Sequence, residues 1–474
     1  MKKLTLIVLT LVLFIACKKE NKEVAQNAET ESQDIAPVTP EMMETAVIYE
    51  ANIRQYSPKG TFEEFTKDIP QLKQLGVKVI WLMPVFPISE TKRKATGGPD
   101  SKFATDFPEE EQKKYLGSYY AVTDFTKINP EYGTIEDFRK LVKTAHENDI
   151  YVILDWVPNH TGWDHIWIKN KPDYYTKDKD GNITHPEGTD WTDVADLNYD
   201  NKAMRKEMIE DMMYWITDEG VDGFRCDVAG SVPLDFWKEC VSELRAKKPL
   251  FMLAEAWEPE LLKGNLFDMA YAWEGHHILN KIAQGEQGVK EWDAYIEKMG
   301  KEYEQDDILM NFITNHDENS WNGTINERMG NAAETMLALS YVAPGMPLIY
   351  SGQEYDLNHR LKFFEKDSIP KTKGKMWPLL EKLGKLKTDN VALNGGKSAA
   401  DYKRLSSENK DVLVFERNKK GTKVTFIANL TDKEQKTTVT ILGNFTDYMN
   451  NTKVEFKEGE TITLKPWEYK ILIN

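Results

Sequence analysis

Short, nearly all-apolar segments alternate with amphipathic helical segments through most of this chain, and this alternation limits the folds that it can adopt. Apolar strands of this length, separated by helices, are typical of a parallel sheet that is buried on both faces. About eight such units in one run favour a closed (β/α)₈ barrel over an open, doubly wound sheet. The segments that read as strands are 46–53, 77–83, 151–157, 223–228, 250–256, 308–314 and 346–352.

Two connections in the predicted barrel, which spans 46–394, are too long to be simple loops. One follows the second strand and runs over about 84–135. The other follows the third strand over 158–200, is rich in Trp, Asp and Gly, and predicts a small inserted domain. From residue 395 to residue 474 polar and apolar residues alternate between turn signals, which predicts an antiparallel β-sandwich.

The first residues of the chain, 1–17, have the pattern of an export signal. A positive start (Met1-Lys2-Lys3) precedes the apolar stretch Leu4–Ile15, which is too short to span a bilayer comfortably. The stretch ends in Phe-Ile-Ala-Cys17, which resembles a bacterial lipobox and predicts lipidation of Cys17; an ordinary cleaved signal is the alternative. Residues 18–45 are polar and predict a flexible tether. A lipoprotein anchored to a membrane of the bacterial cell envelope is expected, with the periplasmic and outer-surface faces both open.

Charge and cysteine content exclude some partners and crosslinks. The net charge is −16 and the part predicted to fold has no basic block. This argues against nucleic acid or anionic lipid as the main partner. Cys226 lies in a strand pattern and Cys240 in the following helix pattern, which predicts two core thiols and no disulfide.

Ionisable side chains gather in four short strings that follow or overlap apolar segments. The strings are DWVPNH at 155–160, GFRCDVAG at 223–230, AEAW at 254–257 and TNHDEN at 314–319. The carboxyl ends of barrel strands meet on the face where such barrels carry their active sites. For each string alone a structural role is the alternative interpretation. Their coincidence on one face favours an active site.

Two of these strings suggest acid–base chemistry. The strand pleat places Arg225 and Asp227 on the same face, and a guanidinium beside a carboxylate favours the ionised form that a nucleophile needs. Glu255 ends an apolar strand, where poor solvation favours a protonated carboxyl that can protonate a leaving group. A pair of carboxyls with these two roles is typical of a glycosidase.

The four strings resemble sequence regions of the α-amylase family of retaining glycoside hydrolases (glycoside hydrolase family 13), over about 46–474. VADLN (194–198), GSYYAVTDFTKINPEYGT (117–134) and GMPLIYSGQE (345–354) resemble three further family segments. The resemblance implies that Asp227 is the nucleophile, Glu255 the general acid/base and Asp317 the stabiliser of the transition state. It also implies a set of side chains around the cleaved bond: Arg225, His160 and His316 on the sugar, Tyr120 stacked on its ring, Asp155 orienting Arg225, and Trp257 near the leaving group.

Two departures from the family pattern bear on this resemblance. Ser118 stands where many members have a His two residues before the stacking Tyr, and Gly230-Ser231 stand where typical members have the Lys-His of a calcium site. No cofactor is expected for the chemistry, and Asn159 is the remaining candidate ligand for a structural Ca²⁺. The stretch 178–182 begins like a calcium loop, but it lacks the downstream Glu and favours a hairpin turn.

The resemblance implies a hydrolase of α-glucosidic bonds, most simply α-1,4 bonds, in starch-like glucans or maltooligosaccharides. The alternatives are an α-glucosidase or transglycosylase on the same fold, and a non-catalytic glycan-binding protein. Residues 91–115 add a stretch where similar family members have only a few residues. Because a loop after the second strand emerges on the catalytic face, this insertion should border the substrate groove. It is either a partly mobile lid or a solvated insertion without a role.

Overall fold

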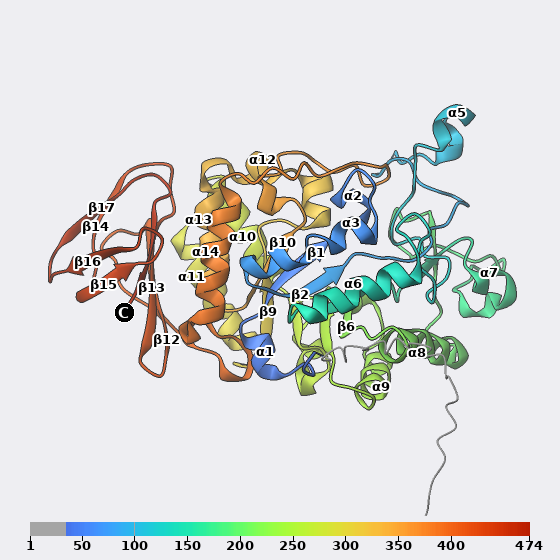
Figure 1. Ribbon diagram of the computed structural model, residues 1–474, viewed down its shortest axis with the longest axis horizontal. Coiled ribbons are helices and arrows are strands. Elements are labelled where there is room, and N and C mark those ends of the chain that lie inside the picture. The colour runs from blue at the N-terminus through green and yellow to red at the C-terminus, as the bar shows by residue number, and fades with distance from the viewer. Residues whose placement is uncertain (1–34, 99) are drawn as a thin grey trace, which may run out of the picture. The chain divides into compact units, whose positions relative to one another are not determined.

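Eight parallel strands close into a barrel in the computed structural model, which describes residues 35–98 and 100–474 (Figure 1). Around the barrel the strands follow the order β1-β10-β9-β8-β7-β6-β3-β2. The predicted (β/α)₈ barrel is confirmed. Its strands are β1 (Val47–Ala51), β2 (Val77–Leu82), β3 (Tyr151–Trp156), β6 (Gly223–Cys226), β7 (Phe251–Ala254), β8 (Met269–Tyr271), β9 (Ile308–Asn311) and β10 (Met346–Tyr350).

Seven of these strands lie within segments predicted from the sequence, and β8 does not. β8 has only three residues, too few to show a periodicity, and the short apolar run 269–273 that contains it does not distinguish a strand from the start of a helix. The tertiary pairing of β8 with β7 and β9 defines it as a strand.

Longer helices connect the barrel strands (Figure 1). In α6, Phe138, Leu141 and Ala145 recur on one buried face. A capping box begins this helix: Thr134 accepts from the Asp137 N–H, and the Asp137 carboxylate accepts from the Thr134 N–H. The longer helices are α6 (Ile135–Glu147), α8 (Lys202–Thr217), α9 (Leu234–Arg245), α10 (Trp273–Ala283), α11 (Val289–Glu302), α13 (Ala333–Val342) and α14 (Met376–Asp389). The shorter ones are α1 (Pro40–Glu44), α2 (Ile53–Tyr56), α3 (Phe62–Thr66), α4 (Ile69–Leu72), α5 (Glu109–Gln112), α7 (Ile166–Asn170) and α12 (Ile325–Met329).

The barrel interior continues into the segment that precedes β1. Val38 and Met43 belong to the same buried cluster as Ile48, Trp81 and Leu253. The side chain of Thr39 caps α1 by accepting from the Met42 N–H. The tether predicted over 18–45 is therefore too long at its C-terminal end, because a capped helix and apolar residues attach residues 38–45 to the barrel. Cys17 and the rest of that tether lie outside the described residues.

The long connection after β3 contains a two-stranded antiparallel sheet of β4 (His160–Gly162) and β5 (Val194–Asp196). The stretch 178–182 forms a turn in which Asp178 accepts from the N–H groups of Asp180 and Asn182. This is the turn that the sequence favoured over a calcium loop.

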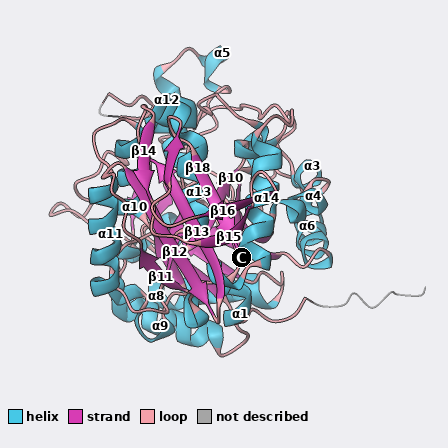
Figure 2. Cartoon of the chain, turned by 90° about the vertical axis from the view of Figure 1, so that its left-hand side faces the viewer, coloured by secondary structure: helices cyan, strands magenta, loops and turns pink. Residues whose placement is uncertain are grey.

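The C-terminal region is an antiparallel β domain (Figure 2). Its larger sheet has the order β11-β12-β13-β18-β15-β16, and β14 pairs with β17. Arg417 of β12 fastens the domain to the barrel region by donating to the carbonyl oxygen of Val342, at the end of α13. The strands are β11 (Asp401–Arg404), β12 (Val412–Lys419), β13 (Thr422–Asn429), β14 (Gln435–Thr438), β15 (Gly443–Asp447), β16 (Thr452–Phe456), β17 (Thr461–Leu464) and β18 (Tyr469–Ile473).

The state of the cysteines and the length of the helices can be compared with the sequence within the described residues. Cys226 and Cys240 are both buried and both free, as predicted. Within the described part of the chain, the helices are too short or too polar to cross a membrane.

Candidate active site

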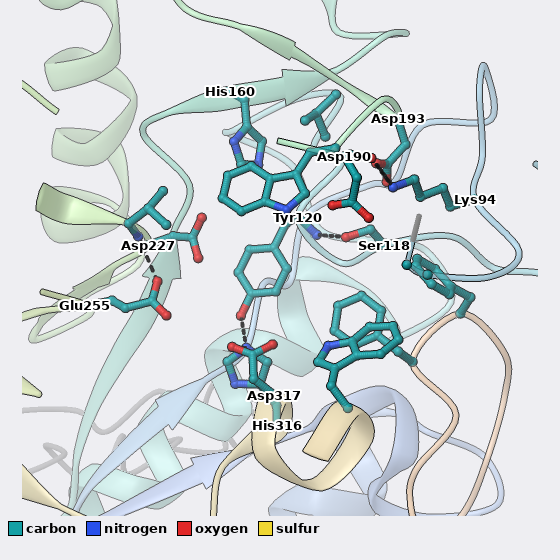
Figure 3. Close-up of a pocket in the computed structure, with 18 residues that line it drawn as sticks. Lys94, Ser118, Tyr120, His160, Asp190, Asp193, Asp227, Glu255, His316 and Asp317 are labelled. Atoms are coloured by element: carbon teal, nitrogen blue, oxygen red, sulfur yellow. Dashed lines mark hydrogen bonds and ion pairs between the residues drawn. The ribbon is translucent and has the colours of Figure 1, made fainter. Parts of the chain in front are cut away.

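A cavity of about 440 Å³ contains most of the residues singled out from the four strings (Figure 3). The strings follow β3, β6, β7 and β9, so they meet at the carboxyl ends of these barrel strands. Six predicted residues line the cavity: Tyr120, His160, Asp227, Glu255, His316 and Asp317. Two more, Asp155 and Arg225, are fully buried beside it.

The buried guanidinium of Arg225 joins three carboxylates. Its Nη1 donates to Asp155 Oδ1 at 2.8 Å and to Asp227 Oδ1 at 2.9 Å. Its Nη2 lies 2.9 Å from Glu255 Oε2 as an ion pair without hydrogen-bond alignment. Its Nε donates to the hydroxyl of Tyr271 at 3.1 Å. One cation therefore holds both predicted catalytic carboxyls, Asp227 and Glu255, close to each other.

Strand pairing and one strained turn produce this arrangement. Arg225 of β6 is paired directly with Asp155 of β3. After Asp227 the chain turns sharply, because Val228 adopts the left-handed conformation with φ 37° and ψ 46°. That conformation is strained for a β-branched residue. The turn aims the Val228 N–H at Glu255 Oε2, to which it donates at 2.8 Å.

The pKa of Asp227 differs from what the Arg–Asp pair alone suggested. Burial and the nearby charge of Glu255 raise the pKa of Asp227 well above its ordinary value, and Arg225 only partly opposes this. The sequence predicted that Arg225 keeps Asp227 ionised, because the local pattern shows the cation but does not show the burial of Asp227 or the closeness of Glu255.

A second buried cation stands across the cavity. His316 Nδ1 lies 2.5 Å from Glu50 Oε1, and its Nε2 lies 2.8 Å from the hydroxyl of Tyr120. That hydroxyl donates to Asp155 Oδ2 at 3.1 Å, so it accepts from His316. Both ring nitrogens are thus donors, as in a protonated imidazole. Burial opposes this charge, but Asp317 and Glu50 raise the pKa of His316 to about 9.

These contacts form one chain of hydrogen bonds from Glu50 through His316, Tyr120 and Asp155 to Arg225. Burial raises the pKa of Asp155 to about 6, and Arg225 opposes the shift. Asp155 also accepts from the Trp81 indole N–H at 3.1 Å. The sequence resemblance placed Asp155 behind Arg225, and the structure puts it there.

His160 and Asn159 bear on the expected metal. Burial lowers the pKa of His160 to about 3, so its ring is neutral, and its Nδ1 lies 3.2 Å from the Asn159 amide nitrogen. In the described chain, 35–98 and 100–474, no three side chains of the His, Cys, Asp and Glu types converge as a metal site. Ca²⁺ also binds amide and backbone carbonyl oxygens, so the role of Asn159 as a calcium ligand stays a prediction.

Trp257 and Ser118 lie at the margins of the site. The Trp257 side chain is 61% exposed and does not line the cavity that holds the carboxylates. It lines a neighbouring cavity of about 510 Å³ together with Tyr271. Ser118 does line the first cavity, and its hydroxyl accepts from the Tyr120 N–H at 3.1 Å. In this chain Ser118 thus helps to position the backbone of Tyr120.

Sequence reasoning missed several residues of the site. Glu50 is a single acidic residue inside the apolar strand β1, and a buried charge of this kind requires a partner, which was an available signal. Tyr271 was missed with β8. Further cavity-lining residues come from loops whose mutual position no local pattern predicts, and they include Lys94, Asp190, Asp193, Trp321, Phe363 and Phe364.

Comparisons with known proteins place the chain among characterised relatives. A family model described as "Alpha amylase, catalytic domain" matches residues 26–390. "Alpha-amylase 3" of Dictyoglomus thermophilum is 29% identical over 355 residues, which cover 65% of this chain and 64% of that protein. A 4-alpha-glucanotransferase of Thermotoga neapolitana is 29% identical over 335 residues, which cover 62% of this chain and 67% of that protein. The chain spans from about half to just under two thirds of the length of the first curated relatives.

A solved structure agrees over a larger share of the chain. The crystal structure of an alpha-amylase from Lactobacillus plantarum superposes with a TM-score of 0.79 at 29% identity. The match covers 91% of this chain and 99% of that one. The likeness therefore extends beyond the barrel into the C-terminal β domain.

The Glu50–His316 contact generates a testable prediction. Replacing Glu50 with Gln removes a negative charge that raises the pKa of His316, so that pKa should fall from about 9 toward the ordinary value. His316 would then lose its proton at a lower pH than in the parent protein. Titration of ¹⁵N-labelled histidines by NMR measures this, with His316→Gln used to assign the signal.

A matched control is Glu219→Gln, which changes a buried Glu that pairs with Arg139 and does not line the cavity. This variant should leave the titration of His316 unchanged. An unaltered pKa of His316 in Glu50→Gln would contradict the role given to Glu50.

Proposed function

The chain belongs to the α-amylase family of glycoside hydrolases, and on that premise we propose that it hydrolyses α-glucosidic bonds with retention of configuration. The proposed substrates are starch-like α-glucans and maltooligosaccharides, with α-1,4 bonds as the simplest target. One observation carries the proposal: the guanidinium of Arg225 holds Asp227 and Glu255 side by side at the cavity, with Asp317 in the same lining. Two carboxyls that flank the scissile bond at close range, one placed to attack the anomeric carbon and the other to protonate the leaving oxygen, are what a retaining mechanism requires.

The proposed reaction has two steps. Glu255 donates its proton to the glycosidic oxygen while Asp227 attacks the anomeric carbon, so the C–O bond breaks and a covalent β-glycosyl ester forms. Glu255, now ionised, then takes a proton from a water molecule that attacks the same carbon and releases Asp227. Two inversions at that carbon leave the α configuration unchanged.

The surrounding residues prepare these steps. Arg225 and Asp155 fix the carboxylate of Asp227 before substrate arrives, so little reorganisation is needed during reaction. Asp317, which lies with His316 at the hydroxyl end of Tyr120 (Figure 3), offers a second negative charge to the developing oxocarbenium ion. Protonated His316 lies 3.4 Å from the Asp317 carboxylate and opposes the rise in the pKa of Asp317 that burial causes.

A transglycosylase is the second candidate for the same site. It differs only in the acceptor, since another sugar would replace water in the second step. The likeness to a 4-alpha-glucanotransferase supports keeping this alternative. Products from maltotriose over time separate the two, because transfer yields oligosaccharides longer than the substrate. The intact carboxyl set argues against a non-catalytic glycan-binding protein.

We also propose that Cys17 is lipidated and anchors the enzyme to a membrane of the cell envelope. The support is the sequence alone: a positive start, an apolar stretch and the Phe-Ile-Ala-Cys17 string. A single acyl chain binds membranes only marginally, so stable anchoring would require the several chains of a lipidated bacterial N-terminus.

Substitution of the three acids tests the proposed chemistry. Asp227→Ala, Glu255→Gln and Asp317→Asn should each lower kcat/KM on a maltooligosaccharide by at least about 10²–10⁴-fold, the usual contribution of general acid–base catalysis. Combined substitutions should cost less than the product of the single effects, because the groups act as a unit. The hydrolysis rate and the circular dichroism spectrum should be measured together.

Asp235→Asn is a matched control, since it changes a carboxylate outside the cavity and should leave the rate unchanged. ¹H NMR of the first product should show the α-anomer. Near-parental hydrolysis by any of the three variants, or a β-anomer formed first, would refute the assignment.

Removal of the predicted lipidation site tests the anchor. Cys17→Ser should move the protein from the membrane fraction to the soluble fraction, while activity per mole of enzyme stays the same. Incorporation of a labelled fatty acid into the parent protein and its absence from the variant provide the direct measurement. Membrane association that survives the substitution would contradict the anchor.

A further inference from the structure

The insertion 91–115 builds part of the wall of the active-site cavity. Lys94 and Gly97 line this cavity together with the predicted catalytic residues. In Figure 3, Lys94 lies with Asp190 and Asp193 at the opposite side of the cavity from Glu255, and Tyr120 lies between them. The insertion therefore borders the end of the cavity that is farthest from the general acid.

This wall is attached to the region between β3 and α8. Lys94 is buried, and its ammonium donates to the Asp190 carbonyl oxygen at 2.5 Å and lies 3.6 Å from the Asp193 carboxylate. At the start of the insertion, the N–H of Thr91 donates to Asp164 Oδ2 at 2.8 Å. The ammonium of Lys92 lies 3.4 Å from the centre of the Trp163 ring. The segment 91–94 is thus held at both of its ends by residues of the connection between β3 and α8.

The other end of the insertion is attached to the loop after β10. Tyr115 forms an antiparallel bridge with Glu365, and the Leu116 N–H donates to the Phe364 carbonyl oxygen at 2.6 Å. Between these attachments the backbone of Gly97 lies against Trp321, since a Cβ on Gly97 would be 2.8 Å from the indole ring.

Trp321 in turn packs on Phe363 and Phe364, with ring centroids 5.1 and 5.9 Å apart. Three segments distant in sequence therefore meet around one end of the cavity. These attachments favour a wall that is permanently in place over the partly mobile lid considered from the sequence.

The proposed reaction determines which part of the glucan lies at this end of the cavity. Glu255 protonates the oxygen that leaves, so the leaving part of the glucan, with its reducing end, lies on the side of Glu255. The sugars toward the non-reducing end lie on the other side of Asp227, where the insertion stands. A chain that continued in that direction would meet Lys94, Gly97 and Trp321.

We propose that residues of this wall restrict the enzyme to the non-reducing ends of α-glucan chains, with Lys94 and Asp190 binding the terminal hydroxyl groups. This inference rests on the proposed hydrolase function. An ammonium has three donors, and Lys94 uses one on the Asp190 carbonyl oxygen while it pairs with the Asp193 carboxylate at 3.6 Å, so a donor remains for a ligand. A terminal sugar carries a free 4-hydroxyl that an internal sugar lacks, so a donor and an acceptor at this end discriminate between them.

A pair of substrates that differ at one end tests this restriction. One is p-nitrophenyl α-maltoheptaoside with a free non-reducing end, and the other carries a 4,6-O-ethylidene group on that terminal sugar. The full-length enzyme should cleave the free substrate and should cleave the blocked one at least about 10²-fold more slowly, because the blocked end cannot enter the walled cavity or bind there.

Two failures are distinguishable. Equal rates on the free and blocked substrates would overturn the restriction to chain ends and leave the proposed hydrolase function intact. Absence of cleavage of both substrates would overturn the proposed function, and the inference with it.

Two variants test the residues of the wall. Lys94→Met should lower kcat/KM on free maltotriose by about 10- to 100-fold through loss of one charged hydrogen bond, whereas Lys113→Met, an exposed position of the insertion that does not line the cavity, should leave it unchanged. Trp321→Ala removes a side chain that is 44% exposed, so folding should be retained, and should raise the rate on the blocked substrate relative to the free one. The role of the wall would be refuted if kcat/KM on maltotriose were unchanged in Lys94→Met and the ratio of the blocked to the free rate were unchanged in Trp321→Ala.

Discussion

The buried guanidinium of Arg225 is the interaction on which the rest of the site depends. Three carboxylates, on Asp155, Asp227 and Glu255, converge on it in a region with little access to water. Burying charge is costly unless each charge has a partner, and removal of one partner from such a group is strongly destabilising. The parallel pairing of β3, β6 and β7 brings the backbones that carry these residues together. The guanidinium then offsets the repulsion between the three carboxylates.

A second cation offsets part of the remaining negative charge across the cavity. Protonated His316 stands between Glu50 and Asp317, and the hydroxyl of Tyr120 connects it to Asp155. The two halves of the site are therefore one hydrogen-bonded network, in which a change of charge at one end alters the pKa of groups at the other. This explains why a strand residue as remote in sequence as Glu50 belongs to the site.

The parts of the fold and site that were predictable have local signals. Seven barrel strands have apolar runs, and Asp227, Glu255 and Asp317 stand in recognisable strings. The strand β8 and its Tyr271 were not predictable, because three residues carry no periodicity. The raised pKa of Asp227 and the wall at Lys94 depend on contacts between segments far apart in sequence, and no local pattern encodes those contacts. For the same reason the end of the tether was misplaced, since its attachment is made by packing of Met43 against the barrel interior.

The left-handed backbone of Val228 has a consequence for how such an enzyme can adapt. A branched residue in this conformation costs on the order of 1–3 kcal/mol, which the surrounding structure must supply. Lineages that move to hotter habitats gain stability through many small substitutions. At this turn, however, a substitution that relaxed the backbone of Val228 would also turn its N–H away from Glu255. Heat adaptation in this barrel should therefore accumulate in its helices and loops, while the turn beside Asp227 retains its strain as a lasting trade-off between durability and catalysis.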